Sequence, residues 1–95
     1  MCIRWMPAAS RDLQSIESHI ADNNPAAADR VADAIYAAVT LLIDHPHRGR
    51  PGKLVGTREL VLPQMPYVIV SVVKEGLIDV LRILHGARSW PELFD

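Results

Sequence analysis

A few residues in the C-terminal half of this 95-residue chain have side chains suited to phosphate chemistry. His85 and Glu59 are candidates for a general acid and a general base, because imidazole and carboxylate groups transfer protons in many active sites. Arg58, Arg82 and Arg88 could hold phosphate oxygens, since a guanidinium group donates hydrogen bonds in a planar fork. If the fold brought them into one cleft, these groups could cleave RNA through its 2′-hydroxyl.

Each of these residues also has a purely structural interpretation. A histidine at the end of a strand is more often a hydrogen-bonded structural group than a catalyst. Arg82 could pair across a sheet with Glu59 or with Asp79, which would stabilise the fold and leave no cation for phosphate. The residue types alone leave the two interpretations open.

A second group of residues is suited to binding a partner. The run that contains Arg48, Arg50, Lys53 and Arg58 has four positive charges and no carboxylate, although such a run is usually a solvated surface. Trp90 and Phe94 flank Pro91 near the C-terminus, where they either dock on the core or remain available to a partner. These six residues are the candidate target-binding set.

Several classes of function are disfavoured by what the chain lacks. Cys2 is the only cysteine, so we expect no intramolecular disulfide and a reducing, cytoplasmic location. His45 and His47 have no evident third ligand, and no phosphate-cradling glycine loop is present, so we expect neither a metal site nor a cofactor. The longest conspicuous apolar run, residues 67–73, is too short to span a membrane, and no segment resembles a signal peptide.

Charge is distributed unevenly along the chain, whose net charge is −1. Up to Asp44 there are three basic and six acidic residues, whereas from His45 onward there are seven basic and five acidic residues. An isoelectric point near 6.4 is well below the value of about 9 typical of domains that grip nucleic acid through its phosphates. We therefore expect no direct DNA binding.

The pattern of apolar residues predicts one α+β domain over residues 1–95. A short strand at 2–6 precedes a helix at 8–22, and Asn24 and Pro25 favour the start of a second helix at 25–44. A loop rich in glycine and proline covers 45–56, and strands follow at 57–62, 67–73 and 77–84, with a turn at 74–76. The expected fold is an N-terminal strand, an antiparallel two-helix hairpin and a three-stranded antiparallel meander, with the first strand at a sheet edge.

Several local motifs in this order resemble the RelE/ParE superfamily of toxins, which includes plasmid stabilisation proteins. The matching stretches include Ala-Ala-Ser-Arg-Asp-Leu at 8–13, Asp-His-Pro-His-Arg-Gly-Arg-Pro-Gly at 44–52 and Leu-Arg-Ile-Leu-His-Gly-Ala-Arg at 81–88. The resemblance extends over residues 3–91 and implies the toxin of a type II toxin-antitoxin system, neutralised by a cognate antitoxin in a hetero-oligomer. Within the superfamily, RelE-like members cleave messenger RNA on the ribosome and ParE-like members inhibit DNA gyrase.

The resemblance favours gyrase inhibition because this chain departs from the nuclease pattern. The nucleases commonly place an arginine at the start of the central strand and an aromatic hydroxyl near the C-terminus, where this chain has Pro66-Tyr67 and Phe94. The preferred interpretation is therefore a toxin that binds its target and is not an enzyme. The alternative is an mRNA endonuclease, whose catalytic residues would be His85, Glu59, Arg82 and Arg88. A second alternative is a degenerate member of the superfamily that is not toxic and only binds antitoxin.

Overall fold

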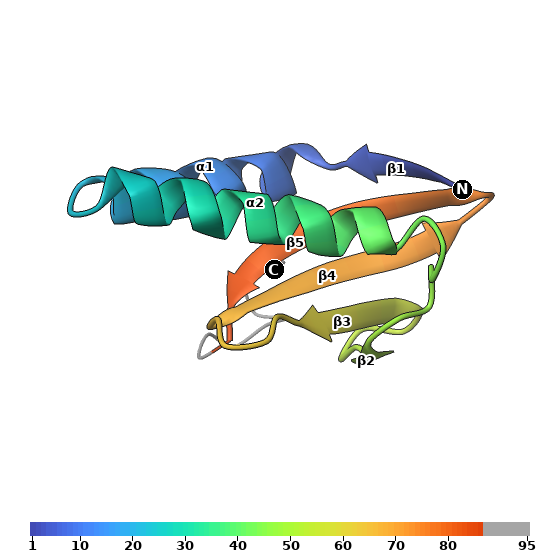
Figure 1. The fold of residues 1–95 in the computed structure, drawn as a ribbon. Helices are drawn as coiled ribbons and strands as arrows, with labels where there is room; N and C mark the ends of the chain where they lie inside the picture. Colours follow the sequence, from blue (N-terminus) through green and yellow to red (C-terminus); the bar gives the residue numbers. More distant parts are fainter. Residues whose placement is uncertain (87–95) are drawn as a thin grey trace.

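The structure, a computed structural model, describes residues 1–86 and consists of two helices packed on one face of a mixed sheet (Figure 1). The strand order is β1-β5-β4-β3-β2, in which β1 is parallel to β5 and the other pairs are antiparallel. The bounds of the elements are β1 Cys2–Trp5, α1 Pro7–Ala21, α2 Pro25–Leu41, β2 Arg50–Pro51, β3 Thr57–Val61, β4 Tyr67–Lys74 and β5 Leu77–His85. The predicted helix hairpin, meander and N-terminal edge strand are confirmed.

Both helices begin where the sequence indicates, each with a proline in its first turn. The side chain of Asn24 accepts a hydrogen bond from the backbone N–H of Ala27 at 3.1 Å, which satisfies one of the free donors at the start of α2. The predicted end of the second helix at Asp44 is wrong, because α2 ends at Leu41. The backbone N–H groups of Leu42 and Ile43 bond three residues back, so the chain tightens into turns before Pro46.

The main core lies between the helices and the sheet. It contains Ala9 and Leu13 of α1, Ile35 and Val39 of α2, and buried residues from the sheet side: Leu62, Ile69, Val80 and Ile83. Ile35 and Ile69 are completely buried. This core fixes α1 and α2 over the sheet, and it defines the face of the sheet that we call the helix face. No helix of residues 1–86 has the length and apolar character needed to cross a membrane.

β5 does not alternate regularly between the two faces of the sheet. Val70 pairs with Arg82 and Ser71 pairs with Val80, so Leu81 is an extra residue that forms a β-bulge. Val80 and Ile83 consequently both join the core on the helix face. The apolar cluster on the opposite face contains Val70 and Leu84, with Leu54 and Leu81 packed against them.

The connections at the ends of the meander follow ordinary turn chemistry. Lys74 pairs with Leu77, and the two residues between them, Glu75 and Gly76, have φ angles of 53° and 77°. Two positive φ values define the tight turn that matches the twist of antiparallel strands, and the turn predicted at 74–76 is therefore confirmed. The two-residue strand β2 was not predicted, because so short a segment containing a proline carries no periodic signal.

Candidate functional surface

Glu59 anchors the loop that precedes its own strand. Its side chain is only 5% exposed, and Oε1 accepts a hydrogen bond from Arg50 Nε at 3.1 Å. The same oxygen forms an ion pair with Arg50 Nη2 at 3.0 Å. Oε2 accepts a further bond from the backbone N–H of Lys53 at 3.2 Å. Both carboxylate oxygens therefore hold the segment from Arg50 to Lys53 against β3. This arrangement supports a structural role for Glu59. The charge of Arg50 is compensated by the same carboxylate.

His85 lies on the other face of the sheet from Glu59. It pairs with Tyr67 at the ends of β5 and β4, and the two rings meet edge to face with centroids 5.9 Å apart. Tyr67 packs against the core on the helix face. Leu60, the neighbour of Glu59 in β3, also packs on that core, so alternation directs Glu59 to the opposite face. The imidazole and the carboxylate thus do not share a cleft.

Arg82 forms a bidentate ion pair with Asp12 of α1. The distances are 2.7 Å from Nε to Oδ2 and 2.9 Å from Nη2 to Oδ1, and the backbone N–H of Ile83 also donates to Oδ2 at 2.9 Å. The hydrogen bond to Asp12 raises the pKa of Arg82. Asp12 was not among the partners expected from the sequence, because no sequence pattern connects residues so far apart in the chain. This pair joins α1 to the C-terminal part of β5, which follows the last residue paired with β1, Val80.

Asp79, the other partner expected for Arg82, binds Arg4 of β1. The guanidinium donates from Nε to Oδ1 at 2.8 Å and from Nη2 to Oδ2 at 3.0 Å. These hydrogen bonds lower the pKa of the buried Asp79 carboxyl. The charge of Asp79 is thus compensated within the parallel β1-β5 pair. Arg88, Trp90 and Phe94 lie outside the described residues.

The predicted run of four cations does not form a single patch. Arg50 is bound by Glu59. Arg58 lies in β3 on the opposite face of the sheet from Glu59, and its backbone pairs with Ser71 of β4. Arg48 and Lys53 are exposed, and neither has an ion-pair partner within residues 1–86. They belong to the segment 45–56, which we call the basic loop.

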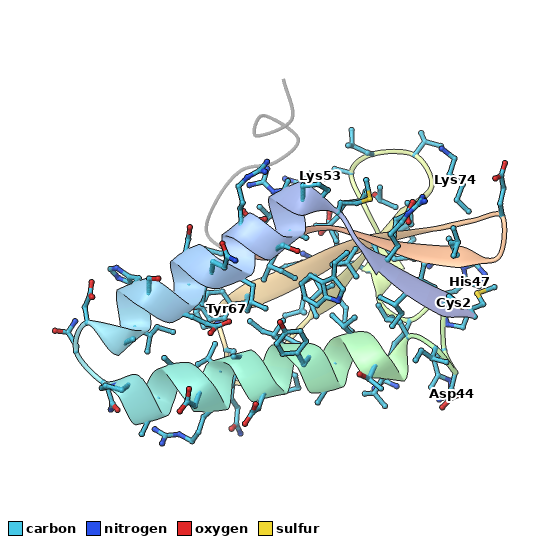
Figure 2. All side chains as sticks on the ribbon, turned by 90° about the horizontal axis from the view of Figure 1, so that it is seen from above. Cys2, Asp44, His47, Lys53, Tyr67 and Lys74 are labelled. Carbon is cyan, nitrogen blue, oxygen red and sulfur yellow. The ribbon has the colours of Figure 1, made fainter. Side chains whose placement is uncertain are left out.

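The basic loop begins beside the C-terminus of α2 and passes to the β3 edge of the sheet. A depression of about 380 Å³ in its first part is lined by His45, Pro46, His47 and Arg48. Figure 2 shows His47 at the end of the molecule where β4 reaches Lys74, far from Tyr67 at the other end. The first part of the basic loop is therefore separate from the His85 site. Within the described part of the chain, no group of three His, Cys, Asp or Glu residues could hold a metal ion.

The last part of the basic loop is folded tightly on the sheet but presents one apolar side chain to water. Leu54 packs against Val70 and Leu84, whereas the next residue, Val55, is fully exposed. Sequence reasoning assigned no role to Val55. Its position between Leu54 and Gly56 in a loop segment was the available signal, although exposed single apolar residues are common on protein surfaces.

Comparisons with known proteins agree with this fold. The family model described as the ParE toxin of the type II toxin-antitoxin system, parDE, matches residues 3–90. Toxin Y4kP of Sinorhizobium fredii is 38% identical over 91 residues, covering 96% of this chain and 94% of that protein. Toxin RelE2 of Caulobacter vibrioides is 37% identical over 84 residues, covering 88% of this chain and 93% of that protein. A chain in the structure of the chromosomal ParDE system of P. aeruginosa superposes with a TM-score of 0.82 and 30% identity, covering 90% of this chain and 95% of that chain.

A helix hairpin on a small meander with an N-terminal edge strand is the architecture of a toxin-antitoxin toxin, and both the sequence and the structural relatives agree with it. The chain belongs to the ParE toxin family of type II toxin-antitoxin systems.

Proposed function

We propose that this toxin arrests growth by binding DNA gyrase in the cytoplasm, without bond-making chemistry of its own. The observation that carries this proposal is the separation of the groups that an RNA-cleaving site would need. Glu59 is bound to the basic loop on one face of the sheet, and His85 contacts Tyr67 on the other face. Arg82 is committed to Asp12. General acid-base cleavage requires such groups within hydrogen-bond reach of one phosphodiester.

We also propose that a cognate antitoxin holds the toxin inactive in a hetero-oligomer. A solved structural relative comes from a ParDE system, which supports a protein partner of this kind. The alanine-rich α2 and the neighbouring apolar sheet offer surface on which an amphipathic helix or an extended segment could lie.

A paired assay tests the proposal. Purified toxin is added to gyrase in a supercoiling reaction and, separately, to translating ribosomes whose messages are mapped for cleavage. We expect inhibition of supercoiling and intact messages. The variant His85→Ala should inhibit as strongly as the wild type, and His19→Ala, an exposed histidine on α1, serves as the matched control. Message cleavage that disappears in His85→Ala would contradict the proposal.

The alternative, RNA cleavage, has one supporting observation of its own. The phenol ring of Tyr67 lies against His85, which places a second proton-transferring group beside the imidazole. In this alternative, Tyr67→Phe and His85→Ala would each remove message cleavage while antitoxin binding is retained. If both variants still arrest growth fully, this pair has no catalytic role.

A further inference from the structure

Val55 stands at the tip of the basic loop with a relative exposure of 104%, although its neighbour Leu54 is packed on the sheet. We infer that residues 52–56 are a preformed docking tip in which Val55 inserts into an apolar pocket of the toxin's protein target, at a site rimmed by carboxylates. This inference rests on the proposed function, because it assumes that the toxin acts by binding. It adds the anchoring residue and the chemistry of the complementary surface.

The tip is held in one shape by its own hydrogen bonds. Gly52 N–H donates to the carbonyl oxygen of Thr57 at 2.8 Å, and Thr57 N–H and Oγ1 both donate to the carbonyl oxygen of Leu54, at 3.2 and 2.6 Å. The backbone N–H of Lys53 donates a hydrogen bond to the Glu59 carboxylate, which holds this part of the tip against the sheet. A loop that is already ordered loses little conformational entropy on binding.

The surroundings of the tip indicate the charge of its partner. The segment from His45 to Arg58 contains no Asp or Glu, and the cations nearest to Val55 in sequence are Lys53 and Arg58. Lys53 is exposed and has no ion-pair partner among residues 1–86. On the partner, an apolar pocket would accept the Val55 side chain, and carboxylates around that pocket would complement the charge of Lys53.

A protein surface fits these features better than nucleic acid does. Valine methyl groups gain nothing from a phosphate backbone, whereas a buried aliphatic anchor near the centre of a protein interface contributes strongly to affinity. Gly56 follows Val55 with a φ of +84°, and a side chain there would be strained. The glycine thus allows the chain to turn back directly after the exposed valine, which leaves Val55 as the protruding residue.

The test measures binding of the intact toxin and its variants to purified gyrase holoenzyme by surface plasmon resonance. Val55→Ala removes two methyl groups from the apolar anchor, so we expect the Kd to rise about tenfold. Val55→Asp should weaken binding further, since a carboxylate would face the acidic rim. The matched control is Val61→Ala in β3, which is also an exposed valine at 49% and should change the Kd less than about twofold. Lys53→Gln should slow association at low salt and lose this effect at high salt.

Growth arrest in cells is measured in parallel, because it does not depend on which target is correct, and antitoxin binding confirms that each variant is folded. If wild-type toxin inhibits gyrase and Val55→Asp inhibits equally well, the docking tip is wrong and the proposed function stands. If wild-type toxin does not inhibit gyrase but Val55→Asp abolishes growth arrest, the target is wrong and the docking tip stands. Toxicity that is insensitive to Val55 but falls with the loss of Lys53 and Arg48 would indicate a polyanion and overturn the inference.

Discussion

The ion pair between Asp12 and Arg82 is the contact whose removal we expect to have the largest local effect outside the apolar core. The Asp12 carboxylate accepts two hydrogen bonds from the Arg82 guanidinium and one from the backbone N–H of Ile83. The substitution Asp12→Ala removes all three acceptors at once. The Arg82 guanidinium and the Ile83 amide then lose these hydrogen bonds to α1.

The magnitude follows from the burial of the pair. Removing one partner of a fully buried ion pair costs about 3 to 5 kcal/mol. The side chains of Arg82 and Asp12 are 18% and 16% exposed, so water screens part of the charge that is left behind. We therefore expect a loss of about 2 to 3 kcal/mol in the free energy of unfolding, or about 10 to 20 °C in Tm for a domain of this size. Asp12→Asn keeps one acceptor oxygen and should lose about half as much.

Urea unfolding followed by circular dichroism measures the global effect, and hydrogen exchange measures the local one. The amide proton of Ile83 should exchange faster in Asp12→Ala than the global loss of stability explains. Arg11→Ala changes the exposed neighbouring residue on α1 and serves as the control. A destabilisation by Asp12→Ala no larger than that of Arg11→Ala, with normal protection of Ile83, would refute the reasoning.

Three further predictions concern stability. Hydrogen bonds from Arg4 hold the pKa of Asp79 below its ordinary value of 3.8, so the stabilisation exists above that pH and is lost as pH falls through the lowered pKa. Asp79→Asn should therefore be less stable than the wild type at pH 7, and urea titrations should show the difference narrowing below about pH 4. Ile35→Ala leaves a cavity in the centre of the core and should cost about 2 to 5 kcal/mol by the same measurement. Asn24→Ala removes the cap of α2 and should cost about 1 kcal/mol, whereas Asn23→Ala should have little effect.

The fold was predictable because its elements carry strong local signals. The spacing of Ala9 and Leu13 indicates a helix with one buried face, and Asn24 with Pro25 marks the start of the next helix. The bulge at Leu81 was not predictable, because β5 is apolar on both faces and its residue pattern fits a regular strand equally well. Only the register with β4 shows where the extra residue lies.

The roles of the charged residues were much harder to predict than the elements that carry them. Arg4 and Asp79 are separated by 75 positions, and Arg82 and Asp12 by 70. A sequence with comparable numbers of acidic and basic residues allows many such pairings, and tertiary contacts alone select among them. Glu59 appeared to be a candidate base for this reason, although its carboxylate supports a loop.

The parallel pairing of β1 with β5 joins the beginning of the chain to its last strand. Contacts between such distant segments form only after nearly all of the polypeptide has been made. If synthesis stops after β4, the product lacks β5, which lies between β1 and β4 in the sheet. β1 then has no strand to pair with, and one edge of β4 is unpaired. Incomplete translation should therefore yield fragments that lack the complete five-stranded sheet, and we expect such unfinished copies to be inactive.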